Sequence, residues 1–213
     1  MNSLNRANLA QGKLAVESSV ASSAVSSVTS SLKPTRILQI GDGNFLRAFV
    51  DWMVDVANGA GLMNGEVIMA QPLERGVAEL MKAQDQLFTV LLRGVHNGKP
   101  VQSKRLVTCV KETLNPYAQW DVMLAAMQDP SLRFVVSNTT ESGIAYVEEA
   151  CVEGKCPANF PAKVTALLLA RFKAFGGSPA SGLVFLPCEL IDTNGSKLKT
   201  FVLQFAEAWK LPA

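Results

Sequence analysis

A glycine turn, Gly41-Asp42-Gly43, constrains this chain more than any other feature, because it joins an apolar run to an amphipathic segment. The apolar run at residues 36–40 predicts a buried strand, and the segment that starts at Asn44 predicts a helix. Gly41 allows a sharp turn after the strand, and Gly43 has no Cβ to keep a pyrophosphate away from the amides at the helix start. The order of strand, turn and helix therefore predicts a nucleotide cradle.

The turn departs from the usual dinucleotide pattern, because Leu46 and Arg47 stand where a third glycine would fall. Arg47 would lie in the first turn of the helix, where the helix dipole disfavours a cation unless an anion offsets it. A bound phosphate would supply that anion, and so would Asp51 four residues later without any ligand. Both interpretations of Arg47 stay open.

The helix expected over residues 44–58 carries a polar and an apolar stripe on opposite sides, the pattern of a helix that packs on a core. The polar stripe comprises Arg47, Asp51, Asp55 and Asn58, and the apolar stripe Phe45, Phe49, Trp52 and Val56. Apolar spacing and caps predict the other elements. They are strands at 66–70, 133–137 and 183–187, and helices at 75–82, from a cap at Asn115, at 161–175 and at 197–209.

Composition limits the classes of partner. The 213 residues, 48% of them hydrophobic and with a net charge of +2, fit one globular domain of moderate size. Scattered lysines and arginines argue against a nucleic-acid partner. No apolar run reaches the roughly 20 residues that span a bilayer, so we expect a cytoplasmic protein with no membrane partner. The four cysteines form no Cys-x-x-Cys pair and lie near no histidine, which predicts reduced thiols and no metal site.

The chain consists of two segments that differ in composition. Residues 1–33 are rich in serine, alanine and valine, which predicts a disordered or flexible N-terminal tail. Residues 34–213 alternate strand and helix patterns, which predicts an α/β fold, a doubly wound, Rossmann-like and mostly parallel sheet. A β-hairpin is inserted in it, because two strand-like runs flank Asn97-Gly98. The single histidine, His96, lies in that turn and is expected to be exposed rather than catalytic.

The second expected strand ends on Ala70-Gln71-Pro72, where dinucleotide cradles usually place an acid that holds the ribose hydroxyls. Gln71 is the candidate for that hydrogen bond. The missing acid also leaves room for a 2′-phosphate, which Arg75 would meet. The residues alone therefore leave the choice between NAD and NADP open.

Hydrogen-bonding side chains gather after the expected strand 133–137, at the carboxyl edge of the sheet, where ligands bind in open α/β folds. Asn138, Thr139 and Glu141 are the candidates for a binding site there. A helix N-cap at Asn138 with Glu141 three residues later would explain the same residues without a ligand. The two interpretations are compatible, and we favour the binding site.

Four segments in order resemble the mannitol dehydrogenase family of long-chain polyol dehydrogenases. They are the glycine-turn segment 36–53, Phe-Thr-Val-Leu-Leu-Arg-Gly at 88–94, Ser-Asn-Thr-Thr-Glu-Ser-Gly-Ile at 137–144, and Pro-Cys-Glu-Leu-Ile-Asp-Thr-Asn-Gly at 187–195. The resemblance implies an N-terminal Rossmann-type domain that binds NAD, followed by a helical domain that supplies a catalytic Lys-x4-Asn-x3-His motif. No lysine of this sequence is followed by asparagine at that spacing, so we expect no catalytic residue in these 213 residues.

The resemblance also implies residue roles. Gly41, Gly43, Asn44 and Phe45 would form the pyrophosphate turn, Asn138, Thr139 and Glu141 would border the nicotinamide, and Glu189 and Asn194 would face the substrate. Mannitol-specific members carry Asp-Asn where this chain has Glu189-Leu190, which favours the sugar-acid branch of the family. The implied reaction is hydride transfer between NADH and tagaturonate to give altronate in hexuronate breakdown.

Several alternatives stay open. Fructuronate or mannitol would be substrates of the same family, whereas a nucleotide-binding module without catalysis or a methyltransferase would belong to another class. A sugar-acid substrate would need the helical domain, and the surface that meets that domain is expected to be apolar. We therefore expect the 213-residue chain to self-associate.

Overall fold

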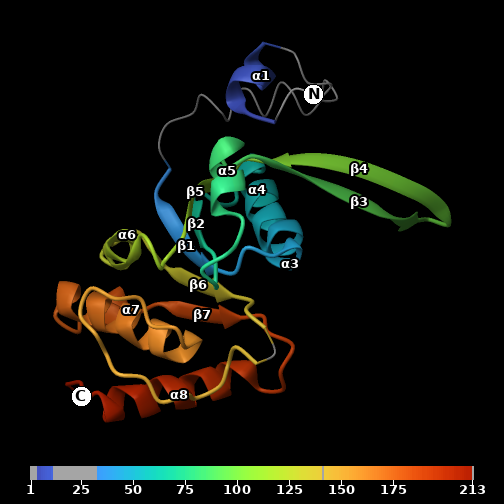
Figure 1. Cartoon of the computed structure of the whole chain (residues 1–213). Helices are drawn as coiled ribbons and strands as arrows, with labels where there is room; N and C mark the ends of the chain where they lie inside the picture. Colours follow the sequence, from blue (N-terminus) through green and yellow to red (C-terminus); the bar gives the residue numbers. More distant parts are fainter. Residues whose placement is uncertain (1–3, 12–32, 141, 213) are drawn as a thin grey trace.

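The computed structural model describes residues 4–11, 33–140 and 142–212, and its centre is a five-stranded parallel sheet (Figure 1). In spatial order the strands are β5 (Val110–Leu114), β2 (Glu66–Ala70), β1 (Thr35–Ile40), β6 (Phe134–Ser137) and β7 (Val184–Pro187). Strand β5 was not among the expected elements. The predicted doubly wound α/β fold is confirmed.

The strand order creates a switch point next to the glycine turn. From β1 the chain adds β2 and then β5 on one side, and it later returns to the other side of β1 to add β6 and β7. The connections after β1 and β6 therefore leave the sheet in opposite directions. In sheets of this kind the crevice at the switch point, outside the carboxyl ends of the strands, is where ligands bind.

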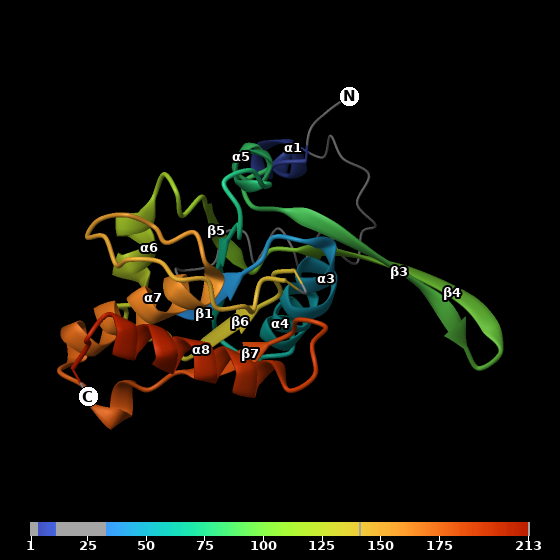
Figure 2. The same ribbon diagram turned by 60° about the horizontal axis from the view of Figure 1, so that its bottom comes forward.

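Two hydrophobic clusters cover opposite faces of the sheet, because successive side chains of a strand point to opposite sides. One face carries Leu38 and Ile40 of β1, covered by α6 (Trp120–Ala126), α7 (Phe160–Phe175) and α8 (Asn194–Ala208). The other face carries Ile37 of β1 and packs on the helix after the glycine turn and on the root of the hairpin. Figure 2 shows α7 and α8 together on one side of the sheet and α4 on the other.

The helix after the glycine turn runs through α3 (Asn44–Leu46), a π-helical segment η1 (Arg47–Asp51) and α4 (Trp52–Gly59). Trp52 packs against the core as expected, but the expected orientation was wrong for two acids and two phenylalanines. Asp51 is fully buried and Asp55 is 7% exposed, whereas Phe45 and Phe49 are each 49% exposed. The acids lie inward because they find hydrogen-bond partners there, Gln39 for Asp51, and Arg105 with Thr108 for Asp55.

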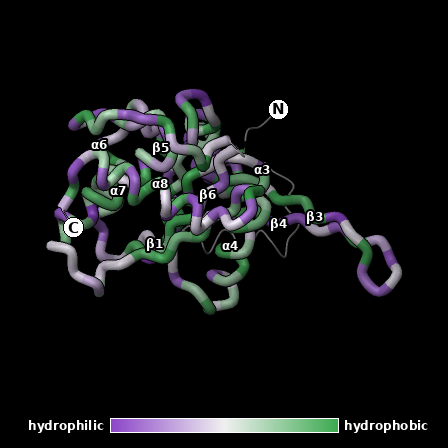
Figure 3. The backbone as a smooth tube through the Cα atoms, turned by 90° about the horizontal axis from the view of Figure 1, so that it is seen from below, coloured by the Kyte–Doolittle hydropathy of each residue, from purple (hydrophilic) through white to green (hydrophobic). Residues whose placement is uncertain are grey.

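The hairpin consists of β3 (Phe88–His96) and β4 (Lys99–Val107), as predicted, and it forms a separate two-stranded antiparallel sheet. Asn97 and Gly98 turn the chain with φ of 50° and 73°. The hairpin projects away from the rest of the molecule (Figures 1 and 2). Hydrophilic and hydrophobic residues alternate along it (Figure 3). Only its root belongs to the core.

Boundaries of the remaining helices differ modestly from the predictions. Asn115 accepts a hydrogen bond from the amide of Tyr117 and so caps a turn, while α6 begins later, at Trp120. Helix α5 spans Ala78–Ala83, α7 ends at Phe175 and is capped by Gly176 with φ of 59°, and a short 3-10 turn, η2 (Pro179–Ser181), precedes β7.

A short helix lies within the segment expected to be a flexible tail. Leu9 of helix α1 (Arg6–Ala10), together with Leu4 just before the helix, packs against Leu87 and Leu106 at the root of the hairpin. Residues 12–32 lie outside the described residues, so the tail and domain boundaries at 1–33 and 34–213 stay a prediction. In the described part of the chain no helix is long and apolar enough to cross a membrane.

Candidate functional site

The carboxyl edge of the parallel sheet brings together most of the residues that the sequence singled out. The glycine turn follows β1, Gln71 follows β2, Asn138 and Thr139 follow β6, and Glu189 follows β7. The amide of Gly41 donates to the carbonyl of Ala70, and the amide of Asn138 donates to the carbonyl of Ile40. The glycine turn is thus fixed to both neighbouring strand ends.

Gly41 is required by the close approach of β6. A Cβ at this position would lie 2.6 Å from the carbonyl oxygen of Asn138 and 2.9 Å from Cδ1 of Leu46. The residue also has φ of 139°, a conformation that other residues rarely adopt. Gly41 therefore allows the turn to pass directly over the end of the neighbouring strand.

Gly43 has the opposite surroundings, because a Cβ there would meet no heavy atom within 4 Å. Its φ of −72° suits any residue, and no side chain caps the helix that follows. Gly43, Asn44 and Phe45 are all exposed. The first amides of a helix have no partner within it, so this open helix start fits an anion such as a pyrophosphate.

Within the described residues Arg47 makes no ion pair with Asp51, while its contact with a phosphate stays a prediction. Its Nη2 donates to Oδ1 of Asn44 at 2.7 Å, and its guanidinium lies 5.7 Å from the centre of the Phe88 ring. Its Nε is buried without a hydrogen-bond partner among the described residues. Arg47 therefore steadies the first residue of the helix, next to the open amides.

Gln71 is 2% exposed and holds the loop after β2. Its Nε2 donates to the carbonyls of Leu73 and Glu74, at 3.0 and 2.8 Å, and its Oε1 accepts from the amide of Ala78. Both amide hydrogens are used inside the chain. The predicted ribose contact would require this loop to rearrange.

Asp42 is a site residue that sequence reasoning missed. Its Oδ2 accepts a hydrogen bond from the amide of Val77 at 2.9 Å, which links the glycine turn to the loop after β2. The available signal was the position of an acid between the two glycines of the turn. No spacing rule pairs that position with a residue 35 places later, so the contact needed the tertiary structure.

Glu189 is 4% exposed and holds the loop after β6. One carboxylate oxygen accepts from Ser137 Oγ at 3.2 Å, and the other accepts from the Thr139 amide at 3.1 Å and from Thr139 Oγ1 at 3.3 Å. Asn138 donates its Nδ2 to the carbonyl of Cys188 at 2.7 Å. Two strand ends are therefore joined by side chains that the sequence assigned to nicotinamide and substrate.

The remaining candidates at this edge have mixed outcomes. Asn194 donates its Nδ2 to the carbonyls of Pro187 and Glu189, so it closes the connection between β7 and α8. Glu141 lies outside the described residues. No helix begins within residues 138–140 and 142–159, so the alternative of an N-cap at Asn138 is wrong.

A buried acid lies beneath the glycine turn. Gln39 Nε2 donates to the carbonyl of Gly41 at 3.0 Å and to Asp51 Oδ2 at 3.3 Å. Burial raises the pKa of Asp51 to about 7, against the opposing effects of the Gln39 hydrogen bond and of Arg47. Gln39 Oε1 and Asp51 Oδ1 have no partner among the described residues, and a protonated carboxyl would offer a donor there.

Lys163 of α7 is 1% exposed and lies near the end of β2. Its Nζ donates to the carbonyl of Pro72 at 3.3 Å and to the Tyr117 hydroxyl at 3.4 Å. Burial lowers the pKa of Lys163. This amine ties α7 to the same loop that Gln71 and Asp42 hold.

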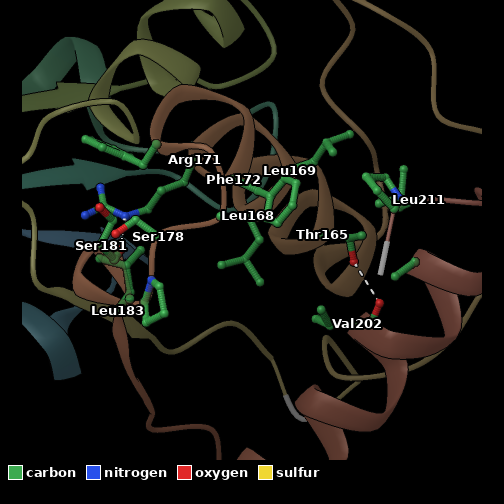
Figure 4. A pocket seen from close by; sticks show the side chains of 16 residues that line it. Thr165, Leu168, Leu169, Arg171, Phe172, Ser178, Ser181, Leu183, Val202 and Leu211 are labelled. Carbon is green, nitrogen blue, oxygen red and sulfur yellow. Dashed lines mark hydrogen bonds between the residues drawn. The ribbon is translucent and has the colours of Figure 1, made fainter.

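A cavity of about 400 Å³ lies elsewhere, between the second half of α7 and α8. Leu168, Phe172 and Val202 line it, and Thr165 donates a hydrogen bond to the carbonyl of Val202 across one side (Figure 4). Its wall includes the segment that precedes β7, so it lies toward the amino edge of the sheet. It is therefore separate from the site at the carboxyl edge.

No group of three or more histidine, cysteine or acidic side chains that could hold a metal ion occurs within the described ranges. The chemistry of the site rests instead on open helix amides, a carboxylate in the turn and the joined ends of β6 and β7. Those features fit an anionic, hydroxylated ligand such as a dinucleotide.

Comparison with proteins of known sequence agrees with this geometry. The altronate oxidoreductase of Halalkalibacterium halodurans is 42% identical over 184 residues, which cover 86% of this chain and 36% of that protein. The altronate oxidoreductase of Yersinia enterocolitica is 44% identical over 181 residues, which cover 84% of this chain and 38% of that protein. The chain therefore spans less than two fifths of these relatives.

Solved structures show the same fold. The Pseudomonas fluorescens mannitol 2-dehydrogenase, in a ternary complex with NAD and D-mannitol, aligns with a TM-score of 0.70 at 19% identity, over 98% of this chain and 43% of that chain. A substrate-free D-sorbitol dehydrogenase aligns with a TM-score of 0.65 at 21% identity, over 83% of this chain and 38% of that chain. Residues 35–212 match the mannitol dehydrogenase Rossmann domain, and the chain therefore belongs to the mannitol dehydrogenase family.

Proposed function

We propose that this chain is the NAD-binding part of an oxidoreductase that transfers a hydride between NADH and tagaturonate, giving altronate. The observation that carries the proposal is the open helix start at Gly43, set in a Rossmann domain whose curated relatives are altronate oxidoreductases. NAD supplies the hydride acceptor and donor of such a reaction. A cytoplasmic location goes with this proposal, because it requires access to the NADH pool.

Each part of the site has a role in this proposal. The amides that follow Gly43 bind the pyrophosphate, and Arg47 steadies Asn44 beside them. Asn138 and Thr139 border the nicotinamide, since they lie across the switch point from the glycine turn. Glu189 keeps the loop after β6 in place through Ser137 and Thr139.

Proton transfer is assigned to a second domain of the family enzyme, because these 213 residues hold no Lys-x4-Asn-x3-His motif, and substrate binding is shared between that domain and this chain. A sugar acid would then contact the edge formed by Glu189 and Asn194 only when a second domain covers it. Orientation of the substrate and a positioned proton donor both contribute large parts of such a rate enhancement. The 213-residue chain is therefore expected to bind NADH without turnover.

Calorimetric titration of the chain with NADH tests the cofactor assignment, with Gly43→Ala as the matched variant. We expect saturable binding by the wild type and strongly reduced binding by the variant, because a Cβ at residue 43 would separate the pyrophosphate from the amides. Binding of adenosylmethionine in place of NADH would refute the assignment.

A chimera tests the substrate. Residues 35–212 would replace the matching segment of the Yersinia enterocolitica altronate oxidoreductase, and NADH oxidation would be followed with tagaturonate, fructuronate and fructose. We expect the highest kcat/KM with tagaturonate. Equal or greater activity with fructuronate or fructose would point to a different member of the family.

A further inference from the structure

The loop after β2 lacks the acid that usually holds the adenosine ribose. Strand β2 ends on Ala70, and the next two residues are Gln71 and Pro72. Both amide hydrogens of Gln71 are used by the carbonyls of Leu73 and Glu74. The strand end therefore offers neither a carboxylate nor a free amide to the ribose hydroxyls.

A carboxylate reaches the same place from the glycine turn. Asp42 Oδ2 accepts the amide of Val77 at 2.9 Å, and a Cβ on Gly76 would lie 2.5 Å from that oxygen. The side chain thus lies against the loop that follows β2. Asp42 is only partly buried, so part of its carboxylate stays accessible at the carboxyl edge of the sheet.

We propose that Asp42 replaces the missing strand-end acid and makes the site select a dinucleotide without a 2′-phosphate. The inference rests on the proposed dinucleotide site. The second oxygen of the Asp42 carboxylate accepts from a ribose hydroxyl, while its charge repels a 2′-phosphate. Two like charges about 4 Å apart near a protein surface repel each other strongly enough to lower the affinity for a 2′-phosphorylated dinucleotide at least tenfold.

Arg75 favours the opposite selectivity, for a dinucleotide with a 2′-phosphate, because its cation is exposed in the same loop. An exposed arginine gains little from a phosphate in bulk water, whereas Asp42 is fixed by a hydrogen bond to the loop backbone. The fixed charge nearer the turn therefore decides the selectivity. The two residues give opposite expectations for NADPH, which makes the proposal testable.

The test compares the affinities of the 213-residue chain for NADH and NADPH by calorimetry, in the wild type and in Asp42→Asn. Asparagine retains an oxygen that accepts from the Val77 amide, so the loop stays attached while the charge is lost. We expect the wild type to prefer NADH at least tenfold, and the variant to lose most of that preference. Glu74→Gln, which neutralises an acid of the same loop, is the matched control and should leave the ratio unchanged.

Ligands that contain only the adenosine half test whether the selectivity arises at the adenosine ribose. The same comparison with 5′-AMP and with adenosine 2′,5′-bisphosphate removes the nicotinamide half, and the preference should persist. A wild type that binds NADPH as tightly as NADH, or an unchanged ratio in Asp42→Asn, would overturn the inference while leaving dinucleotide binding intact. Failure to bind either dinucleotide would overturn the inference and the proposed function together.

Discussion

Asp55 of α4 and Arg105 of β4 form an ion pair of 2.7 Å between Oδ2 and Nε, and this pair joins the helix after the glycine turn to the root of the projecting hairpin. Asp55 Oδ1 also accepts the amide and the hydroxyl of Thr108, and Arg105 Nη2 donates to the Asp55 carbonyl. Two isolated strands are marginally stable in water. The Asp55 carboxylate therefore adds a polar attachment to the apolar packing that holds the root of the hairpin.

Removal of that carboxylate should destabilise the chain more than removal of its charged partner. Asp55→Ala leaves the Thr108 amide unpaired and is expected to lower the free energy of unfolding by about 2 to 4 kcal/mol. Arg105→Met keeps most of the apolar stem, and Arg105 is 34% exposed, so solvent screening reduces its loss to about 1 kcal/mol. Urea unfolding measures both, and equal losses would contradict the assignment.

The two glycines of the turn should respond differently to alanine. Gly41→Ala places a Cβ 2.6 Å from the Asn138 carbonyl oxygen at φ of 139°, so it should lower the free energy of unfolding by about 2 kcal/mol or more. Gly43→Ala meets no atom within 4 Å, and its stability should change by less than about 1 kcal/mol. Thermal unfolding without NADH distinguishes the two variants, and with NADH both should lose the stabilisation that the cofactor gives the wild type. A Gly43→Ala variant still stabilised by NADH would contradict the assigned pyrophosphate site.

Stability should fall with rising pH because of Asp51. Its pKa is about 7 in the folded chain against an ordinary value of 3.8, so between these values the folded state holds a proton that the unfolded state has lost. The contribution of Asp51 is therefore complete below about pH 4 and is lost as pH rises through 7. At about 1.4 kcal/mol per pKa unit, the loss between pH 5 and 7 is about 2 to 3 kcal/mol.

Asp51→Asn removes this dependence and provides the comparison. Urea unfolding at pH 5, 6 and 7 should show a smaller decline in the variant than in the wild type, because asparagine does not titrate. Parallel declines in the two proteins would show that Asp51 is ionised in the folded chain throughout this range.

Self-association is expected through the edge strand β7. Its outer edge pairs with no strand of the described chain, and Val184 and Leu186 are each 47% exposed on one face. We expect the 213-residue chain to elute above its monomer mass in size-exclusion chromatography with light scattering, and Leu186→Lys to shift it toward the monomer. Leu62→Lys, at an 85% exposed residue away from that edge, is the control. A wild-type monomer at high concentration would contradict the expectation.

Local patterns were sufficient to predict most of the sheet and the hairpin. Strands β1, β2, β6 and β7 carry apolar runs, and Asn97-Gly98 fits a turn that needs positive φ at both residues. The ends of α6 and α8 were less well predicted, because caps compete with nearby turns, as Asn115 does. Strand β5 was missed because Lys111, Glu112 and Thr113 interrupt its apolar pattern at the edge of the sheet.

The sequence by itself determined most of the order of strands and helices, the glycine turn and the family, since these depend on residues close together in the chain. Only the tertiary structure decided which side of the helix after the turn faces the core. Amphipathic spacing places acids outward, but Asp51 and Asp55 are buried because Gln39 and Arg105 reach them from other elements. The same reason applies at the site, where Asp42 meets Val77 across 35 residues and Glu189 meets Thr139 across 50. Such pairs exist only after the strands are placed side by side.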